Sequence, residues 1–450
     1  MPKVTVIMPS LNVVKYIGAC IESVLAQTLK DIEILVIDAG SDDGTIELLQ
    51  KYAALDARIR IIHSDRRSYG YQMNLGIALA QGEYVGIVET DDMIDPAMYM
   101  TLYNAAVDTD ADYVKGRAAL FMELEARAVW SQPVGSPLKK DMLGKVISPR
   151  TMPELLMRDI YSWTGIYKSK FVKQIVLNET PGAAFQDQGF LFQTISSADQ
   201  AVYLDEVFYL YRQDNSGSSI YNQNGFHYLV EEYAYIEKFL TDKDEEWTSV
   251  YYQRMLNQCL GRFRTMAASG SFWEEAITDM EILRGRLEQI EKNKLLKNSD
   301  MDNDKKELLR MFCKDVKELY YYYLEYFQKQ QKAVYDILQE VNHRPGIIFG
   351  CGKLGKFLHA LLESREPGLI VAFCDNNSEL WNTKLQGTLI MKPEEVVGRY
   401  PDAVYIITSA RNANDIRCQL INFGITQENI YVSQIELNLL LLQCRGDVIS

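Results

Sequence analysis

The chain has few of the residues from which metal centres and disulfide frameworks are built. Its seven cysteines are scattered without a Cys-x-x-Cys pair, and its four histidines are isolated. This pattern argues against a structural zinc site and indicates free thiols in a reducing compartment. The apolar runs are far too short to span a bilayer, and the chain opens on an apolar strand pattern rather than a signal peptide. We therefore expect a cytoplasmic protein that can still touch a membrane from that side.

Positive charge is also in deficit. The chain has 47 Lys and Arg against 61 Asp and Glu, which gives a net charge of −14 and a pI near 5.0. This balance argues against a large nucleic-acid surface, so we expect no nucleic-acid partner. A length of 450 residues is too great for one hydrophobic core and predicts two or three domains.

The first part of the chain, to about residue 115, alternates between strand and helix patterns. Apolar, β-branched runs occupy residues 4–8, 32–37, 59–62 and 84–88. Helical spacing follows the first run, with Asn12 as the expected N-cap, and two further helices are predicted around residues 46–52 and 71–80. Alternation of this kind predicts an α/β fold with a parallel sheet of the nucleotide-binding type.

Clustered carboxylates follow the fourth predicted strand, in the run Glu89-Thr90-Asp91-Asp92. Ligands bind at the carboxyl ends of the strands in open α/β sheets. Carboxylates this close raise one another's pKa unless a cation lies among them, and one or two carboxylates plus substrate phosphates can hold a divalent ion. A solvated Asp-rich turn is the alternative interpretation. Polar residues also end the first strand, at Pro9 and Asn12, and the second, at Asp38, although Asp38 alone could equally hold a turn.

These segments resemble family 2 glycosyltransferases in their order along the chain. The resemblance covers about the first 215 residues, and the acidic run falls where that family has its Asp-x-Asp signature. It implies a GT-A fold, a nucleotide-diphosphate sugar donor, and Mn²⁺ or Mg²⁺. The segments that carry it are residues 4–12, 23–28, 37–45, 74–84 and 89–92.

Carried over to this sequence, the resemblance implies a donor side and a metal site. Asp38 would face the nucleotide base, and Asp91 would be the chief metal ligand. Glu89 stands where Asp is usual, and Met73 stands where Arg is frequent, which puts one phosphate contact in doubt. The complete set implied for donor binding is Pro9, Asn12, Asp38, Asp65, Asn74, Asp91 and Arg212, and the set implied for the metal is Asp91, Glu89 and Asp92.

The same resemblance implies a catalytic base and an acceptor side. Asp187 falls at the family's base position, although the Glu that usually precedes it is Gln186 here. An N-cap role for Asp187 is the alternative. Trp163 lies in a segment that often lines the acceptor side in this family. Arg212 would supply a bidentate contact to the donor diphosphate, with a surface salt bridge as the alternative.

Two further regions follow the predicted GT-A domain at residues 1–225. Residues 226–342 contain long amphipathic stretches, which predict a helical linker or oligomerisation region. Residues 343–450 contain a strand, a glycine-rich turn with Gly350, Gly352 and Gly355, and Asp375 after the next strand. This spacing is the dinucleotide-binding fingerprint, so we expect a C-terminal Rossmann-like α/β domain that can hold a nucleotide or dinucleotide.

The leading hypothesis is an inverting, metal-dependent glycosyltransferase of the hexosyltransferase type. The donor would be a nucleotide-diphosphate sugar, with UDP as the first choice of nucleotide, and the acceptor would be a saccharide or lipid-linked glycan in bacterial surface-polysaccharide synthesis. Contact with the inner membrane and homo-oligomerisation are open to such a protein. The alternative is an NAD- or nucleotide-binding oxidoreductase or regulatory protein whose first domain only binds nucleotide-sugar. A scaffold with vestigial sites is the third possibility.

Overall fold

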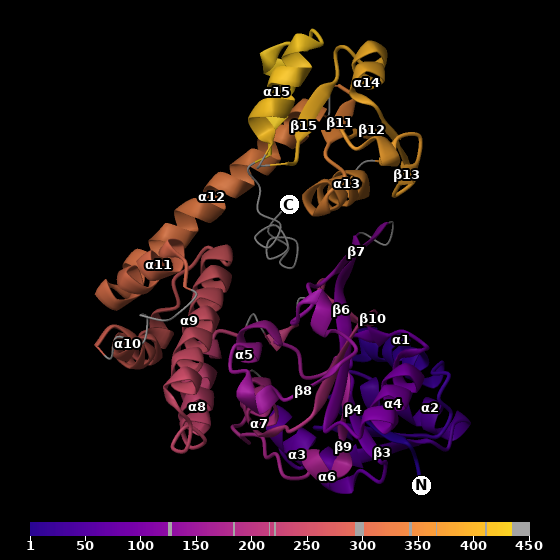
Figure 1. The fold of residues 1–450 in the computed structure, drawn as a ribbon, viewed down its shortest axis with the longest axis vertical. Helices are drawn as coiled ribbons and strands as arrows, with labels where there is room; N and C mark the ends of the chain where they lie inside the picture. The colour runs from indigo at the N-terminus through magenta and orange to yellow at the C-terminus, as the bar shows by residue number, and fades with distance from the viewer. Residues whose placement is uncertain are drawn as a thin grey trace. The chain divides into compact units, whose positions relative to one another are not determined.

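The structure is a computed structural model that describes residues 1–124, 128–182, 185–215, 217–219, 222–292, 301–341, 344–365, 367–409 and 412–433. It divides into two compact units (Figure 1). Unit 1 comprises residues 1–120, 133–266 and 271–320, and unit 2 comprises residues 121–132, 267–270 and 321–450. Among the described residues, no helix is long and apolar enough to cross a bilayer.

The predicted α/β fold class is confirmed, and a large sheet forms the core of unit 1. Its four parallel strands are β3 (Ile59–His63), β2 (Ile32–Asp38), β1 (Val4–Ser10) and β4 (Tyr84–Ile87), in that spatial order. The sheet continues through β9 (Gly165–Lys168), β6 (Tyr113–Leu124), β10 (Ala201–Arg212) and β5 (Met93–Ile94). Strand β7 (Ala128–Pro133) pairs with β6, and β8 (Val146–Ile147) pairs with β10.

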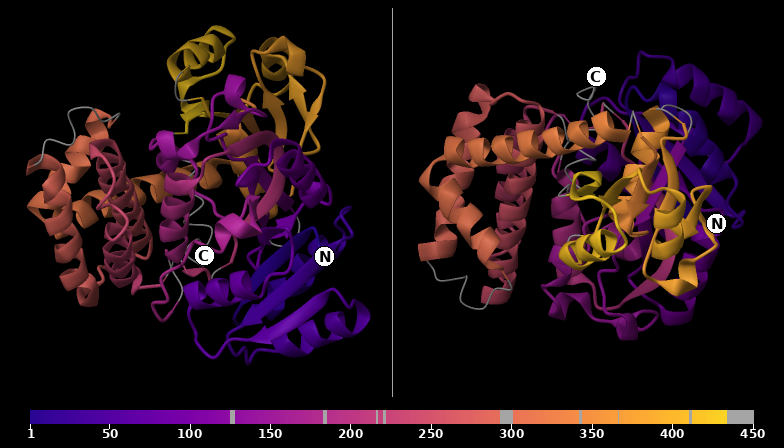
Figure 2. Two further views of the ribbon diagram at one scale, coloured as in Figure 1. Left: turned by 60° about the horizontal axis from the view of Figure 1, so that its bottom comes forward. Right: turned by 90° about the horizontal axis from the view of Figure 1, so that it is seen from above.

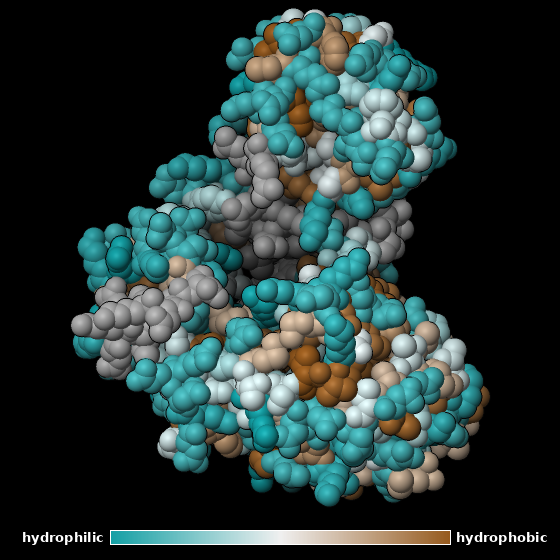
Figure 3. Space-filling view, viewed as in Figure 1, coloured by the Kyte–Doolittle hydropathy of each residue, from teal (hydrophilic) through white to brown (hydrophobic). Residues whose placement is uncertain are grey.

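Every residue of β1, β2 and β4 is buried, because helices of the same unit cover the sheet. Helix α1 (Val14–Leu25) shows how this burial arises, since its buried positions Ile17, Cys20, Ile21 and Val24 recur at helical spacing. The surface facing the viewer in Figure 3 is largely hydrophilic, with hydrophobic side chains gathered over the middle of the strands of unit 1. The helices that connect the strands are α2 (Thr45–Leu55), α3 (Tyr69–Leu79), α4 (Met98–Thr109), α5 (Leu155–Arg158), α6 (Ser169–Val172) and α7 (Gln186–Ser197).

Long helices follow the sheet, as the amphipathic stretches predict. Helices α8 (Gly225–Glu237), α9 (Glu245–Ala268), α10 (Ile277–Lys292) and α11 (Asn303–Lys314) lie together in Figures 1 and 2. Helix α8 packs directly against α7 of the sheet region. The first part of the helical region therefore belongs to the same compact unit as the sheet, and helix α12 (Val316–Val341) runs on from it.

Unit 2 contains a second sheet, of six strands among the described residues, in the order β13-β14-β12-β11-β15-β16. The pairs among β14 (Thr388–Met391), β12 (Ile370–Cys374), β11 (Gly346–Phe349), β15 (Val404–Ile407) and β16 (Ile430–Val432) are parallel, and β13 (Lys384–Leu385) is antiparallel to β14. Helices α13 (Lys353–Arg365), α14 (Pro393–Arg399) and α15 (Ala413–Asn422) connect these strands.

Candidate active site

The carboxyl ends of β1 and β2 lie side by side, and Asp38 organises the turn that follows them. Ser10 pairs in register with Asp38. The buried carboxylate of Asp38 accepts hydrogen bonds from the Gly40 and Ser41 amides, both at 2.9 Å, and from the Ser41 hydroxyl at 2.6 Å. Asp38 therefore holds the turn, as the local interpretation of its sequence predicts, and its predicted contact with a nucleotide base stays a prediction.

Asn12 lies at the same sheet edge, but the expected N-cap role is wrong. Helix α1 has Val13 as its N-cap residue, without a side-chain capping bond. Asn12 instead adopts a left-handed conformation at φ 52°, and its side-chain oxygen accepts a hydrogen bond from the Asp42 amide at 2.9 Å. The exposed Asn12 thus ties the end of β1 to the turn after β2, which shapes this edge of the sheet.

The acidic run forms a tight turn directly after β4. The Asp92 amide bonds to the Glu89 carbonyl, and the buried Thr90 hydroxyl donates to the Pro9 carbonyl at 3.0 Å. Pro9 is thus placed beside the acidic turn through its main chain. Glu89 accepts a hydrogen bond from the Tyr69 hydroxyl at 2.7 Å. Burial raises the pKa of Glu89 to about 8, with Asp91 and Asp187 acting in the same direction and Tyr69 opposing.

Asp91 and Asp92 have different surroundings although they are adjacent. Asp91 is half-buried, and its carboxylate accepts a hydrogen bond from the Asn215 side chain at 2.8 Å. Asp92 is fully buried, with one oxygen bonded to the Arg212 amide at 2.7 Å and the other without a hydrogen bond among the described residues. Burial raises the pKa of both carboxyl groups. Asp91 is therefore the member of the pair that a donor can approach, and Asp92 anchors the turn.

The buried Arg212 closes the turn from the end of β10. Its Nε donates to the Asp91 carbonyl at 2.9 Å, and its guanidinium contacts Asp214 at 3.2 Å and lies 4.9 Å from the Tyr16 ring. The salt-bridge alternative is confirmed in part, because Arg212 pairs with Asp214, but the guanidinium is buried rather than at the surface, with 6% of Arg212 exposed. The guanidinium lowers the pKa of Asp91 and so offsets part of the negative charge.

The donor set fits a divalent ion that is shared with a substrate, and does not fit a closed protein cage. Within the described ranges, no group of three or more His, Cys, Asp and Glu side chains could hold an ion together. Asp92 is buried, and Glu89 is bonded to Tyr69. The half-buried Asp91 raises the pKa of the neighbouring Glu89, and Mg²⁺ is commonly held by one or two such carboxylates together with substrate phosphates. Asp91 would be the direct protein ligand.

Asp187 lies in the first turn of α7, within electrostatic reach of the acidic turn. Its charge raises the pKa of Glu89. The N-cap alternative is wrong, because the N-cap residue is Phe185 and the helix begins at Gln186. Burial raises the pKa of Asp187, which is half-buried, while the Gln188 side chain and Arg254 lower it. Asp187 is therefore an acid of raised pKa close to the predicted donor site, which is the environment of a general base.

Two residues of the helical region support the start of α7. Arg254 of α9 is buried, and its guanidinium donates to the Gln188 side chain and to the Leu156 carbonyl, both at 2.8 Å. Glu232 of α8 accepts a hydrogen bond from the Gly189 amide at 2.8 Å. Sequence patterns gave no signal for these residues, because they lie on helices predicted only to link or oligomerise.

Glu232 should make stability depend on pH. Burial raises its pKa to about 8, so between about pH 4.3, the pKa of an unfolded Glu, and pH 8 only the folded state keeps this proton. The free energy of unfolding should therefore fall with rising pH in this window, by about 1.4 kcal/mol per pH unit from this group. Denaturant titrations from pH 5 to 8 should show a shallower fall for Glu232→Gln. Equal slopes for the two proteins would contradict the assignment.

The segment that carries Trp163 builds an aromatic stack against β10. The Trp163 ring lies between Tyr161, at 4.5 Å, and Tyr209, at 4.0 Å, and Tyr211 lies at its edge, 5.1 Å away. Only 6% of Trp163 is exposed, whereas Tyr161 is half-buried. The Tyr209 hydroxyl accepts a hydrogen bond from the Glu89 amide at 2.9 Å. Trp163 therefore backs the site, and Tyr161 offers the outer aromatic face.

The structure places two other predicted donor residues at the margin of this region. The side-chain amide of Asn74 donates to the Leu177 carbonyl and to Glu179, both at 3.0 Å, and its oxygen accepts from the Leu177 amide. Asn74 thus ties α3 to the segment before α7. Asp65 is exposed after β3, where it raises the pKa of Tyr71 through a side-chain hydrogen bond. Donor contacts by Asn74 and Asp65 stay predictions.

In unit 2, the glycine-rich turn has the predicted strand–turn–helix setting. Gly350 has φ +116°, and a Cβ atom on Gly355 would lie 2.1 Å from the Gly350 carbonyl oxygen, while Gly352 has open space. The Asp375 carboxylate accepts hydrogen bonds from the Cys351 and Asn377 amides, both at 2.9 Å. Asp375 therefore holds the turn in place, and its predicted contact with a ribose stays a prediction.

Comparison with known families gives two matches along the chain. Residues 5–164 match the model of Glycosyl transferase family 2, and residues 343–431 match the model named C2185-like, N-terminal. The first match spans β1 to the Trp163 segment and includes the acidic turn. Asp187 and Arg212 lie beyond the matched range.

Individual proteins also match part of the chain. Glycosyltransferase GlyG of Streptococcus pneumoniae is 29% identical over an alignment of 225 residues, and the match covers 48% of this chain and 72% of that protein. The uncharacterized glycosyltransferase EpsJ of Bacillus subtilis is 31% identical over an alignment of 220 residues, and the match covers 47% of this chain and 62% of that protein. Among solved structures, S. aureus TarS aligns over 69% of this chain and 55% of its own, at 16% identity and a TM-score of 0.47.

Proposed function

We propose that this chain is an inverting enzyme that uses nucleotide-diphosphate sugars. The premise is that it is a glycosyltransferase with a family 2 domain in its N-terminal part. The donor is a UDP-sugar in the first instance, and the transferred group is a hexose. The observation that carries the proposal is the meeting of three separate segments at one sheet edge. These are the acidic turn after β4, the end of β10 with Arg212, and the start of α7 with Asp187.

The proposed reaction is a single displacement. The acceptor hydroxyl oxygen attacks the anomeric carbon as the bond from that carbon to the diphosphate oxygen breaks. Asp187 takes the hydroxyl proton, which requires its ionised form. In this proposal, the positive charge of Arg212 and the amides of the neighbouring turns would stabilise the leaving diphosphate. A divalent ion held by Asp91 would neutralise charge on that diphosphate when bound.

The raised pKa of Asp187 predicts how the transfer rate depends on pH. Its raised pKa should place the acidic limb of the transfer rate above pH 3.9, the usual pKa of Asp. Arg254 lowers this pKa, so Arg254→Met should move the limb to higher pH. The matched control is Gln258→Met, which removes a neutral hydrogen bond of 3.2 Å to the same Gln188 side chain. Profiles of kcat against pH measure the position of the acidic limb. An unchanged limb in Arg254→Met would show that Arg254 does not lower the pKa of Asp187.

The remaining parts of the proposal concern the acceptor and the second unit. The acceptor is a saccharide or lipid-linked glycan of a surface polysaccharide, and the half-buried Tyr161 ring suits one face of a sugar. The glycine-rich turn of unit 2 supports nucleotide binding there. Thermal shift with a panel of nucleotide-sugars and with nicotinamide dinucleotides tests both sites, since ligands that bind the folded state raise its Tm.

A further inference from the structure

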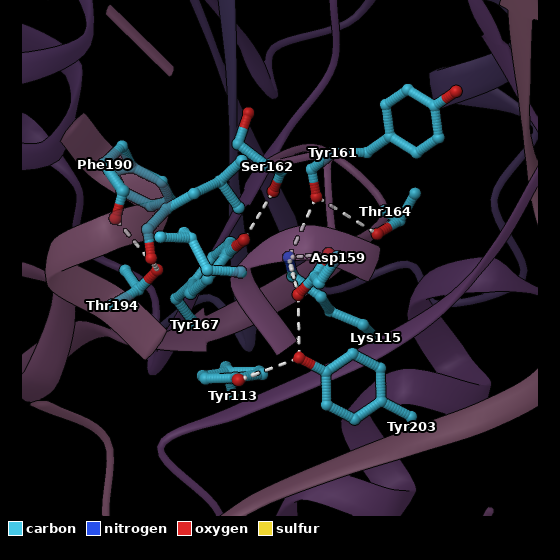
Figure 4. Close-up of polar contacts among 12 residues, drawn as sticks. Tyr113, Lys115, Asp159, Tyr161, Ser162, Thr164, Tyr167, Phe190, Thr194 and Tyr203 are labelled. Carbon is cyan, nitrogen blue, oxygen red and sulfur yellow. Dashed lines mark hydrogen bonds and ion pairs between the residues drawn. The ribbon is translucent and has the colours of Figure 1, made fainter. Parts of the chain in front are cut away.

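A buried ion pair lies beneath the segment that carries the aromatic stack. Lys115 of β6 and Asp159, which follows α5, have side-chain exposures of 2% and 4% (Figure 4). The Lys115 Nζ donates to the two Asp159 carboxylate oxygens at 2.9 and 2.7 Å. Isolated charges are very costly to bury, so a pair in this position requires full compensation by polar partners.

The partners around this pair supply that compensation. The third Nζ hydrogen of Lys115 goes to the Tyr161 carbonyl at 2.9 Å. Asp159 also accepts a hydrogen bond from the Tyr203 hydroxyl at 2.7 Å, and the Tyr203 and Tyr113 hydroxyls lie 2.9 Å apart. Burial lowers the pKa of Lys115, and Asp159 opposes that change. The result is a closed polar network that joins β6 and β10 to the segment 159–164.

The same network fixes the main chain of that segment. The Tyr167 hydroxyl donates to the Ser162 carbonyl at 2.6 Å, and the Gly116 amide donates to the Thr164 carbonyl at 3.0 Å. Together with the Lys115 bond to the Tyr161 carbonyl, three carbonyls in four residues are held by strands β6 and β9. The Tyr161 and Trp163 side chains therefore extend from an anchored backbone, as Figure 4 shows for Tyr161.

The anchored segment reaches the proposed active site through the aromatic stack. Through the stack, Trp163 packs on Tyr209, whose hydroxyl accepts the Glu89 amide. The stack therefore connects the anchored segment to the main chain of the acidic turn.

A contribution to folding stability does not by itself explain why this position holds a buried ion pair. Replacing a buried ion pair by apolar side chains of similar volume is often neutral or stabilising, whereas removing one partner is strongly destabilising. We infer that Lys115 and Asp159 are a positioning pair that fixes the Tyr161–Trp163 segment for use of the acceptor sugar. The inference rests on the proposed function of the neighbouring site, and neither residue touches the reacting atoms.

The double variant Lys115→Met/Asp159→Leu tests the inference, because it leaves no unpaired charge. It should keep a Tm close to wild type and bind UDP-sugar with a dissociation constant within about threefold of wild type. Its kcat/KM for p-nitrophenyl glycoside acceptors should fall roughly 10- to 100-fold, the effect of displacing a substrate-positioning group by about 1 Å. The near-UV circular dichroism of the Trp163 stack should change as well. The control is Arg117→Met/Asp205→Asn, which removes an ion pair of 2.8 Å between β6 and β10 and should keep acceptor use within about twofold.

The outcomes distinguish the positioning role of Lys115 and Asp159 from the proposed function of the site. Wild-type acceptor use in the double variant would overturn the positioning role and leave the proposed function intact. An equal loss of donor affinity and acceptor use would also overturn it, because the pair would then act on the whole site. A wild-type protein that releases no nucleoside diphosphate from any nucleotide-sugar would overturn the proposed function itself, and this inference with it.

Discussion

Asp187→Asn should abolish most sugar transfer while leaving donor binding nearly unchanged. The substitution keeps the shape of the side chain and its hydrogen bond with Gln188 but removes the group that accepts the proton. General-base catalysis contributes roughly 10²- to 10⁴-fold, and kcat should fall by that factor. The dissociation constant for UDP-sugar should stay within about threefold, since the proposal assigns the donor phosphates to Asp91 and Arg212 instead.

The control for this prediction is Asp199→Asn. Asp199 follows the same helix, and its side chain is 63% exposed in an ion pair with Arg150, so its removal should change kcat less than about twofold. Nucleoside-diphosphate release and isothermal titration give the two quantities. A full rate in Asp187→Asn would show that another group takes the proton, and an equal loss of donor affinity would place Asp187 on the donor side.

Asp91→Asn should weaken both donor binding and transfer, in contrast to Asp187→Asn. Asp91 is half-buried, whereas Asp92 is fully buried and Glu89 is bonded to Tyr69, so we assign the charge that a divalent ion between turn and diphosphate would use to Asp91. Loss of one such electrostatic contact to the leaving group should lower kcat/KM roughly 10²- to 10³-fold. The gain in UDP affinity on addition of Mn²⁺ should shrink as well.

Glu89→Gln is the matched comparison for Asp91→Asn. The Gln side-chain oxygen can still accept the Tyr69 hydrogen bond, so the turn should keep its shape. We expect its loss of kcat/KM to be at least about tenfold smaller than that of Asp91→Asn. Calorimetric titration of UDP with and without Mn²⁺ measures the difference. If Mn²⁺ raised the UDP affinity equally in wild type and Asp91→Asn, Asp91 would not be a metal ligand.

Local patterns were sufficient to predict the strands that form the donor edge. The β-branched runs at β1, β2, β3 and β4 are short, mostly apolar and separated by turn residues, and each lies within about two residues of its predicted bounds. The polar ends of these strands converge because parallel strands share one carboxyl edge, so Asp38 and Asp91 could be placed before the structure was known.

Contacts between distant segments could not be predicted in this way. Asn215 reaches Asp91 across 124 positions of sequence, and Arg254 reaches Gln188 across 66. Sequence spacing carries no signal for such pairs, because the antiparallel strands β6, β9 and β10 and the packing of α8 on α7 create them. The same limitation applies to Lys115 and Asp159, which look like ordinary surface charges until burial is known.

The anomeric configuration of the product tests the central account most directly. ¹H NMR should be recorded on the product formed from an α-linked UDP-sugar and a p-nitrophenyl glycoside in the presence of Mn²⁺. Direct attack by an acceptor hydroxyl that Asp187 deprotonates predicts a β-configured glycosidic bond in wild type and almost no product in Asp187→Asn. An α-configured product would contradict single displacement with Asp187 as the base.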